Sequence, residues 1–357
     1  MTLIIAEAGV NHNGDEKLAF KLVDAAYKAG ADIVKFQTFK AKNLVTADAE
    51  QAEYQLVNTK KQESQLAMLS RLELSWDAHH ALVKHCEALG IEFLSTAFDS
   101  ESLDFLVNDL GIKRLKLPSG ELTNAPLVLE HARTGCDIIV STGMATLAEI
   151  EAALGVIAFG YTAEKNAVPD RQAFEEAYAS VAGQKALKEK VTILHCTTEY
   201  PAPVDEINLR VMDTLRNAFD LPAGYSDHSE GIIIPVAAVA RGAVIIEKHF
   251  TLDKNMDGPD HKASLEPEEL SAMVRAIRQV EVALGGCIKS PTVSEVKNKA
   301  IARKSLVAAK AIAKGEAFDE TNLTIKRPGK GMSPYQYWEL LGTVSSKSYA
   351  AGELILE

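Results

Sequence analysis

The sequence predicts an α/β protein in which a (β/α)8 TIM barrel is followed by a small β-rich domain. Two observations favour the barrel. Short runs rich in β-branched residues alternate with helical stretches over roughly 280 residues, as in barrels of parallel strands. Polar residues also follow the end of each run, where such barrels place their active sites. A change of composition after residue 284 predicts the second domain.

The predicted elements follow one another as strand, helix, strand. The strands are expected at residues 3–9, 32–38, 92–98, 113–120, 137–143, 191–197, 222–228 and 243–250. The stretch 15–30 starts with acidic residues and ends at a glycine, and 76–90 ends in the same way. Both patterns are typical of helices that cover a barrel, because acids favour a helix start and glycine a helix end.

Two inserts interrupt the alternation. Residues 40–74 follow the second strand, on the side of the barrel where the strands end, which we call the mouth. We expect this insert to form a lid or a loop that contacts substrate. Residues 160–190 precede the sixth strand and are therefore expected at the opposite face, as structural decoration.

The C-terminal part predicts a linker and a second domain. We expect a barrel domain at 1–284, a linker at 285–301 and a small domain at 302–357. The last segment repeats a short pattern, "KAIAKGEAF" and "KSYAAGELI", each predicting a strand that turns at Gly-Glu. Its loop "IKRPGKGMSP" places Lys326, Arg327 and Lys330 among glycines.

Composition limits the possible partners. The chain has 357 residues, 47% of them hydrophobic, and a net charge of −11. This charge disfavours nucleic acid, whose phosphates require a basic surface. No apolar run is long enough for a membrane span, and the N-terminus lacks a signal-peptide pattern, so a cytoplasmic protein is expected. The four cysteines show no metal or disulfide spacing and are expected to be reduced, structural thiols.

Every predicted strand ends in polar residues. Because the ends of parallel barrel strands meet at the mouth, these side chains are expected to share one site. They are Glu7, Lys35, Gln37, Ser95, Thr96, Lys116, Ser119, Glu121, Ser141, Thr142, His195, Ser226, Asp227, His228, Glu247 and His249.

His228 and His249 are candidate metal ligands because they follow the adjacent seventh and eighth strands. Two imidazoles with open positions suit a divalent ion such as Mn²⁺, with Mg²⁺ or Co²⁺ as alternatives. The sequence contains no His-x-His pair of the kind expected in a zinc hydrolase. We therefore favour an ion that polarises a carbonyl group.

Lys35 and Lys116 could neutralise an anion, aided by hydroxyl groups of serine and threonine residues at neighbouring strand ends. Either lysine could instead form a Schiff base, as in a barrel aldolase. Glu7 and Glu247 lie on the first and eighth strands, which are neighbours in a closed barrel. They could act as a general base and a hydroxyl-orienting group, or simply as structural partners of lysines. The proposed hydroxyl donors are Ser95, Thr96, Ser119 and Ser226.

Motifs along the whole chain resemble the sialic acid synthase (N-acetylneuraminate synthase) family. They are "IIAEAGVNHNG", "VKFQTF", "STAFD", "LPSGE", "STGMA", "HCTTEYPAP", "YSDHSEG" and "IEKHFTLDK" with "GPDHKAS". The tail, from "ARKSLVAAKAIAKGEAF" to "IKRPGKGMSP", resembles that family's C-terminal antifreeze-like SAF domain, which has a β-clip fold.

The resemblance implies an enzyme that condenses phosphoenolpyruvate with N-acetylmannosamine, an N-acetylated mannose-type sugar, giving N-acetylneuraminate and phosphate. It implies metal ligation by His228 and His249. The positions implied for phosphoenolpyruvate are Lys35, Thr96, Lys116, Ser119 and Ser226. Those implied for the sugar and its reacting carbonyl are Glu7, Glu247 and Asp260, with Gln37 and Tyr200 in the substrate pocket.

The resemblance also implies a homodimer with a swapped C-terminal domain, in which Arg327 reaches the sugar's N-acetyl group in the neighbouring subunit. One position departs from some members, which have Asn where this chain has Thr198. Two other functions stay open. The enzyme could make legionaminic acid or another nonulosonic acid from a 6-deoxy diacetamido sugar, or the chain could be a non-catalytic sugar-binding protein.

Overall fold

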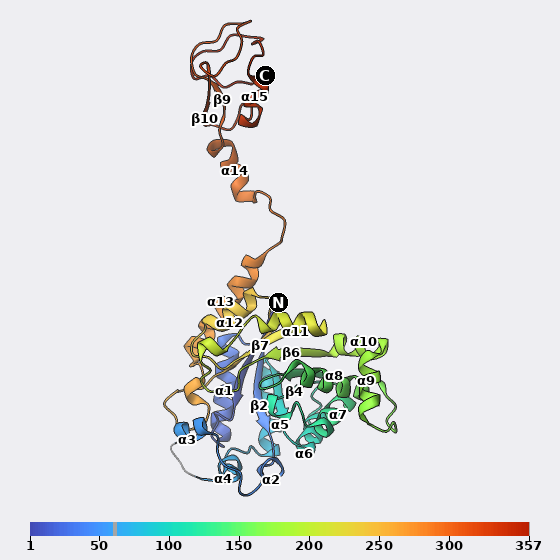
Figure 1. Ribbon diagram of the computed structural model, residues 1–357. Helices are drawn as coiled ribbons and strands as arrows, with labels where there is room; N and C mark the ends of the chain where they lie inside the picture. Colours follow the sequence, from blue (N-terminus) through green and yellow to red (C-terminus); the bar gives the residue numbers. More distant parts are fainter. Residues whose placement is uncertain (60–62, 357) are drawn as a thin grey trace. The chain divides into compact units, whose positions relative to one another are not determined.

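The computed structural model describes residues 1–59 and 63–356. Within them, eight parallel strands pair in sequence order and close a barrel, which confirms the predicted fold (Figure 1). Each strand lies within its predicted run. Their bounds are β1 Leu3–Gly9, β2 Ile33–Thr38, β3 Glu92–Ala97, β4 Arg114–Leu117, β5 Asp137–Ser141, β6 Val191–His195, β7 Ala223–Asp227 and β8 Ile245–His249.

The two helices predicted from sequence form as expected. In α1, Glu16–Ala29, the Asp15 carboxylate accepts bonds from two backbone N–H groups of the first turn. Gly30 then ends the helix with a φ of 83°, a conformation that favours glycine. In α5, Trp76–Leu89, Gly90 has the same role. The other barrel helices are α6 Ser100–Asp104, α7 Ala125–Arg133, α8 Leu147–Thr162, α11 Val211–Phe219, α12 Ile233–Ala240 and α13 Pro267–Leu284.

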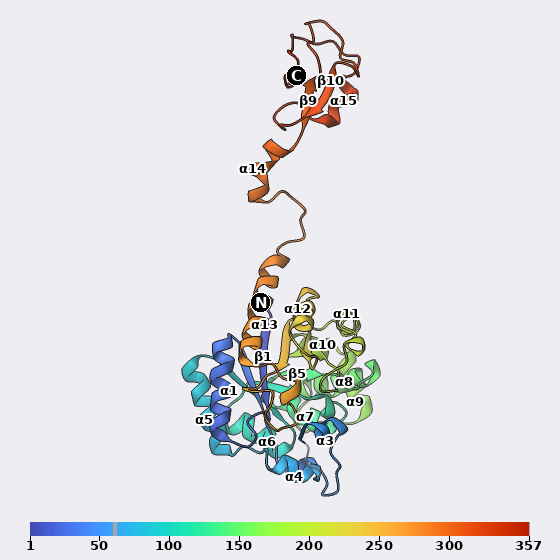
Figure 2. The same ribbon diagram turned by 90° about the vertical axis from the view of Figure 1, so that its left-hand side faces the viewer.

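The inserts lie at opposite ends of the barrel. Helices α2, α3 and α4 of the first insert lie at the end opposite the N-terminus, which is the mouth (Figures 1 and 2). The second insert ends directly before β6 starts, so it belongs to the other end. The first contains α2 Ala41–Leu44, α3 Glu53–Thr59 and α4 Gln65–Ser70, and the second contains α9 Arg171–Ala179 and α10 Val181–Lys190.

The barrel interior has an apolar layer below the mouth. Its side chains come from six strands and are at most 2% exposed. Because side chains alternate along a strand, the residues two positions further on also point inward, and these are polar or charged. The apolar layer consists of Ile5, Ile33, Leu94, Ile139, Leu194 and Ile245.

The chain divides into two compact units, Met1–Gly285 and Gly286–Glu357. The second contains α14, Val293–Ala302, which lies in the stretch predicted as a linker except for its last residue. Its strands are β9, Ser305–Ala308, and β10, Leu323–Lys326, which pair antiparallel. The two sequence repeats were predicted to form strands, but they form only isolated bridges, one of which joins Ile312 of the first repeat to Tyr349 of the second. Each repeat turns at its glycine, Gly315 or Gly352, and residues of both repeats belong to a small core that includes Phe318 and Tyr349.

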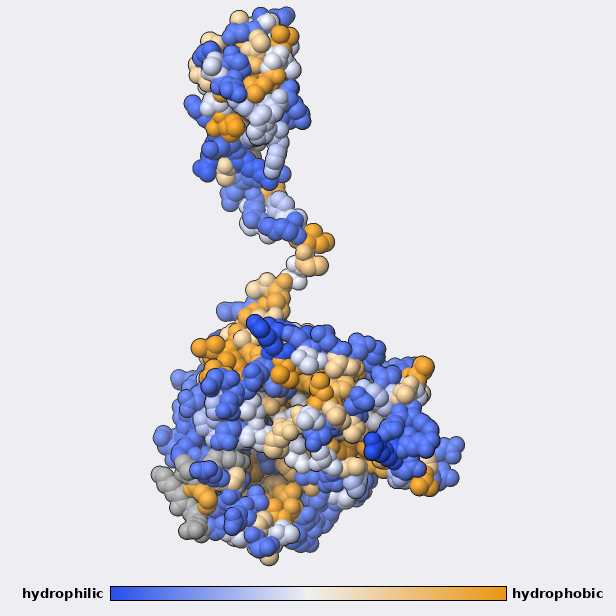
Figure 3. Space-filling model, in the orientation of Figure 1, coloured by the Kyte–Doolittle hydropathy of each residue, from blue (hydrophilic) through white to orange (hydrophobic). Residues whose placement is uncertain are grey.

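Figure 3 shows that hydrophilic residues cover most of the visible face of the barrel unit, with apolar residues in scattered patches. No helix among residues 1–59 and 63–356 is long and apolar enough to cross a membrane.

Candidate active site

Most of the predicted site residues of the barrel line one cavity at the mouth, with a volume of about 330 Å³. The structure therefore brings together side chains from seven strand ends or the loops that follow them, as the barrel fold requires. These residues are Glu7, Lys35, Gln37, Thr96, Lys116, Ser119, Tyr200, Ser226, His228, Glu247, His249 and Asp260.

Two lysines and two glutamates form a chain of ion pairs on the cavity floor. Lys35 Nζ lies 2.7 Å from Glu7 Oε2 and 3.5 Å from Glu247 Oε2. Lys116 Nζ lies 3.1 Å from Glu247 Oε1, which also accepts a 2.8 Å hydrogen bond from Ser226 Oγ. All four charged side chains are at most 5% exposed. The alternative prediction that the carboxylates are lysine partners is thus correct in geometry.

This arrangement gives the two glutamates different proton affinities. Burial raises the pKa of Glu7 to about 7, although Lys35 beside it favours the carboxylate. Burial also opposes the charge on Glu247, but Lys116 and Lys35 together lower its pKa well below the usual value. Burial likewise disfavours the charge on Lys35, yet its two carboxylate neighbours raise its pKa. The two lysines therefore favour the ionised form of Glu247, whereas burial favours the protonated form of Glu7.

His228 and His249 lie side by side at the ends of the neighbouring strands β7 and β8, with ring centres 5.5 Å apart and the ring planes at 61°. His228 Nδ1 donates a 2.5 Å hydrogen bond to the carbonyl oxygen of Thr197, so Nε2 carries no proton and has a free lone pair. His249 Nδ1 is buried without a hydrogen-bond partner among the described residues. Burial lowers the pKa of His228 to about 4, and burial together with His228 lowers that of His249 well below its usual value.

Neutral imidazoles with unused nitrogen lone pairs are the form that binds a divalent ion, so these residues fit the predicted metal. Within the described residues, however, no group of three or more His, Cys, Asp or Glu side chains is placed to hold an ion. A metal held here would need further ligands from water or substrate.

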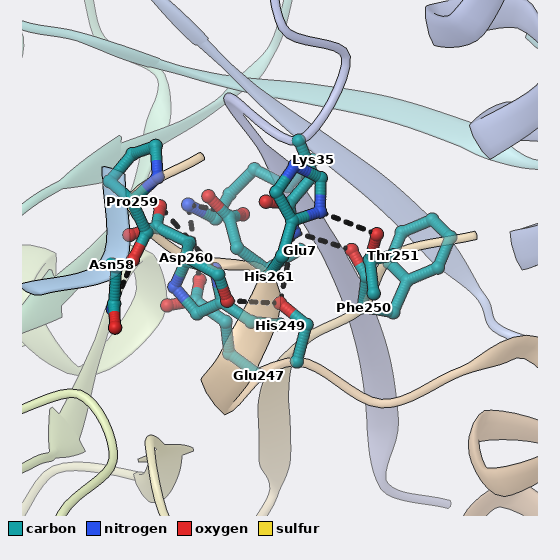
Figure 4. Close-up of polar contacts among 12 residues, drawn as sticks. Glu7, Lys35, Asn58, Glu247, His249, Phe250, Thr251, Pro259, Asp260 and His261 are labelled. Carbon is teal, nitrogen blue, oxygen red and sulfur yellow. Dashed lines mark hydrogen bonds and ion pairs between the residues drawn. The ribbon is translucent and has the colours of Figure 1, made fainter. Parts of the chain in front are cut away.

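Asp260 lies beside this pair and is held through its backbone. Its Oδ2 is 3.9 Å from His249 Nδ1, and burial raises its pKa to about 6. The preceding residue, Pro259, accepts a 2.7 Å hydrogen bond from Asn58 Nδ2 of the first insert. Figure 4 shows Glu7, Asp260 and His249 clustered together, with Asn58 beside Pro259. Sequence reasoning did not identify Asn58, because its partner lies some two hundred residues away.

A second group of small polar side chains surrounds Gly143. Its backbone N–H donates to Ser119 Oγ at 3.0 Å, and Ser119 Oγ lies 3.2 Å from Cys196 Sγ. A Cβ atom on Gly143 would lie only 2.3 Å from Thr198 Oγ1, so a side chain there would clash with its neighbours. Cys196 was predicted as a structural thiol only, but it lines the cavity because it follows the inward-pointing Leu194 by two positions.

Some predicted strand-end groups face away from the cavity. Ser95 bonds Thr38 at 2.7 Å on the outer side of the strands, so its predicted role as an anion donor is wrong. The neighbouring Thr96 points inward instead. His195 also points outward and bonds the carbonyl oxygen of Ile207 at 2.6 Å. The reason is that side chains alternate along a strand, so only every second residue at a strand end can point into the barrel. Thr142 and Asp227 likewise do not line the cavity.

The first insert forms one wall of the cavity, as expected for a substrate-contacting segment. None of residues 160–190 lines it. The contribution of individual insert residues could not be predicted, because their positions depend on how short helices pack over the mouth. The insert residues that line the cavity are Leu44, Val45, Gln55, Gln65, Met68, Leu69 and Leu72.

Arg327 lies in the second unit. Its Nε donates a 3.0 Å hydrogen bond to the carbonyl oxygen of Ala302, at the end of α14, and the side chain is exposed. The predicted contact of Arg327 with a sugar in another subunit stays a prediction.

Known proteins resemble this chain over its whole length. The N,N'-diacetyllegionaminic acid synthase of Campylobacter jejuni is 53% identical, covering 100% of this chain and 99% of the relative. The enzyme of the same name from Legionella pneumophila is 43% identical, covering 99% and 93%. Among solved structures, the N-acetylneuraminic acid (sialic acid) synthetase of Leptospira borgpetersenii in complex with citrate has a TM-score of 0.66 at 31% identity, covering 83% of this chain and 90% of that one.

The family models agree with these relatives. The model of the NeuB family matches residues 22–289, which is well over half of the chain, and that of the SAF domain matches residues 303–357. Both matches confirm the resemblance predicted from the sequence motifs. The chain is therefore an enzyme of the NeuB family, and it carries a SAF domain at its C-terminal end.

Proposed function

We propose that this enzyme condenses phosphoenolpyruvate with a 6-deoxy sugar carrying two acetamido groups, giving a legionaminic-type nonulosonic acid and phosphate. The observation that supports a condensation is the cavity floor, where Glu7, Lys35, Glu247 and Lys116 alternate in charge below two neutral histidines. The support for this sugar is the 53% identity to a relative named for N,N'-diacetyllegionaminic acid. N-acetylneuraminate synthesis, the main expectation from sequence, is supported only at the level of the family.

The lysines hold the anionic substrate. Two lysines paired with two ionised glutamates carry no net charge, which gives a phosphate and a carboxylate little attraction. When Glu7 takes up a proton near pH 7, the four groups carry one net positive charge. We propose that phosphoenolpyruvate binds this protonated form, with its anionic groups on Lys35 and Lys116. Hydroxyl groups of Thr96, Ser119 and Ser226 then complete its hydrogen bonds.

The reaction joins C3 of phosphoenolpyruvate to the aldehyde carbon of the open-chain sugar, and the electron pair of the C=C bond forms the new C–C bond. Water adds at C2, and phosphate leaves with cleavage of its C–O bond. Glu7 is placed to exchange a proton with this water or with the sugar hydroxyl, because its pKa of about 7 matches neutral pH. Glu247 stays ionised and orients Ser226 and both lysines.

A divalent ion, Mn²⁺ in our proposal, would supply Lewis-acid polarisation of the sugar aldehyde when held by His228 and His249. Asp260 lies close enough to His249 to contact the same region of the sugar. The Schiff-base alternative is disfavoured for Lys35, whose pKa is raised by its carboxylate partners, because an imine forms only from the neutral amine.

The proposal is tested by phosphate release from phosphoenolpyruvate with a panel of sugars. We expect the 6-deoxy diacetamido sugar to give at least about tenfold higher kcat/KM than N-acetylmannosamine, a difference of roughly 1.4 kcal/mol. Water labelled with ¹⁸O should place the label in the nine-carbon product and not in phosphate. A preference for N-acetylmannosamine would favour N-acetylneuraminate synthesis instead. Absence of phosphate release with every sugar, while sugars still bind, would favour a non-catalytic sugar-binding protein.

We also propose a cytoplasmic homodimer in which Arg327 completes the site of the neighbouring subunit. The support is the resemblance of the tail to the SAF domain of related synthases. Mixing Arg327→Ala chains with His249→Ala chains should create some sites with both residues intact and so restore activity. If verified subunit exchange restores none, Arg327 does not act across subunits.

A further inference from the structure

A buried ion pair joins β7 and β8 directly behind the two histidines. Asp227 and Lys248 are paired residues of the two strands, and both side chains are 0% exposed. Lys248 Nζ lies 2.6 Å from Asp227 Oδ2. The residues that follow them are His228 and His249, whose rings line the cavity. Because side chains alternate along a strand, the pair lies on the outer side of the barrel wall while the histidines point inward.

The residues before and after His228, Asp227 and Ser229, are both bonded to this ion pair or belong to it. Asp227 precedes His228, and its Oδ1 accepts hydrogen bonds of 3.0 and 2.7 Å from the backbone N–H and Oγ of Ser229. Lys248 Nζ also donates to the carbonyl oxygen of Ser229. Lys248 thus bonds both ends of the short segment from Asp227 to Ser229, and His228 is the residue between them.

His249 depends on the same lysine through its backbone. Its Nδ1 has no hydrogen-bond partner among the described residues, and the 3.9 Å contact with Asp260 Oδ2 is too long to be a hydrogen bond. Lys248, the preceding residue, is anchored to Asp227 on the neighbouring strand. The two histidines thus follow residues of neighbouring strands that are joined both by the strand pairing and by this ion pair.

Stability alone does not account for such a pair. Removing two charges from water costs several kcal/mol each, and well-packed apolar residues in their place are often equally or more stabilising. An ion pair differs from apolar residues in fixing direction, because its hydrogen bonds have defined geometry. Outer groups that orient metal ligands in this way typically change metal affinity by 10- to 100-fold.

We propose that Asp227 and Lys248 are positioning residues that set the spacing and direction of His228 and His249 for a divalent ion. This inference rests on the proposed metal binding, and it concerns residues that contact neither substrate nor metal.

The test is a Mn²⁺ titration of full-length wild-type protein and variants, in which electron paramagnetic resonance measures the concentration of the free ion. Lys248→Met and the double variant Asp227→Asn with Lys248→Met should each weaken Mn²⁺ binding by about 10- to 100-fold. The double variant should recover part of the Tm lost in Lys248→Met, because it leaves no unpaired buried charge. Its Mn²⁺ affinity should stay low. Lys248→Arg, which keeps the charge and can keep the pair, should bind Mn²⁺ more tightly than Lys248→Met.

The matched control is the ion pair of Arg278 and Asp32, in which Nη2 of the arginine lies 2.7 Å from Oδ2 of the aspartate. Asp32 precedes β2, so this pair lies at the end of the barrel away from the mouth. The double variant Asp32→Asn with Arg278→Met should lower Tm without changing Mn²⁺ affinity. This separates loss of stability from loss of positioning.

A second readout needs no metal. Long-range ¹H–¹⁵N spectra of the histidine rings should show the signals of His228 and His249 shifted or broadened in Lys248→Met and unchanged in the control. Where Lys248→Met fails to fold, Asp227→Asn and Lys248→Arg give the same comparison.

Two results would overturn the proposal, and they differ. If the wild type binds Mn²⁺ and the folded double variant binds it within about threefold, the pair is only structural. If the wild type itself binds no divalent ion, the proposed metal site fails together with this inference.

Discussion

The barrel interior contains two layers of side chains that lie two residues apart along the same strands. The lower layer is apolar, with residues such as Leu94, Leu194 and Ile139. The upper layer includes Lys35, Glu247 and other polar groups at the corresponding positions. Backbone geometry is the same in both, so the difference comes from the side chains alone.

The two layers therefore have different requirements. An apolar side chain is stabilised by burial with any well-packed neighbours, and its loss costs free energy roughly in proportion to the volume removed. A buried charge is stable only with its partners in place. Each charge of the upper layer therefore depends on its neighbours, and burial together with these neighbours gives Glu7 and Glu247 different pKa values.

The largest expected effect comes from a charge in the upper layer. Lys116→Met removes a cation that lies 3.1 Å from Glu247. Glu247 keeps Lys35 as a partner, so the barrel should still fold. We expect kcat/KM to fall by about 10³-fold, because the site loses a focused charge for the anionic substrate. Steady-state kinetics with far-UV circular dichroism measure this, and a loss below tenfold would contradict a role for Lys116 in binding or catalysis.

A cavity in the lower layer should affect stability instead. Leu194→Ala should lower the free energy of unfolding by about 2–5 kcal/mol, because the barrel wall cannot collapse into the space. The folded variant should keep kcat within roughly threefold of wild type, since Leu194 lies below the charged layer. Urea unfolding and kinetics at low temperature test this. A selective loss of kcat without loss of stability would show that the layers are not separate.

A buried histidine outside the barrel interior, His79, should make the free energy of unfolding depend on pH. His79 is buried behind β2, where it bonds Thr38 at 2.9 Å, and burial lowers its pKa to about 4. Between pH 6.5 and 4 the unfolded chain takes up this proton and the folded chain does not. Stability from His79 is therefore full above pH 6.5 and decreases by up to about 3 kcal/mol as the pH falls to 4. The pH dependence of unfolding should become shallower in His79→Gln, and an unchanged slope would contradict this.

The smallest effect is expected from a conservative change in the lower layer. Ile139→Val removes one methylene group and should destabilise the protein by about 0.5–1.5 kcal/mol without changing kcat. The neighbouring inward position, Ser141, provides the comparison because it lines the cavity. Ser141→Ala should change KM for phosphoenolpyruvate and leave the urea midpoint nearly unchanged. The opposite pattern in either variant would contradict the division into layers.

The sequence by itself determined the fold and most members of the site. Eight apolar runs of strand length, separated by helices with clear ends, are compatible with few folds other than a closed barrel. Once the barrel is predicted, each strand end must lie at the mouth. Lys35, Glu247 and His249 were therefore identified from local patterns and from motifs that resemble a known family.

Tertiary structure alone decided which neighbour at each strand end points inward. Ser95 and Thr96 are both polar and adjacent; the family resemblance implied Thr96 alone, and the closed barrel gives the physical reason, because Thr96 lines the cavity while Ser95 bonds Thr38. It also decided the pairing of Lys35 with both glutamates, and the hydrogen bond from Asn58 that holds the loop of Asp260. These contacts join residues far apart in sequence, so their geometry depends on strand register and loop packing, which no local pattern of residues encodes.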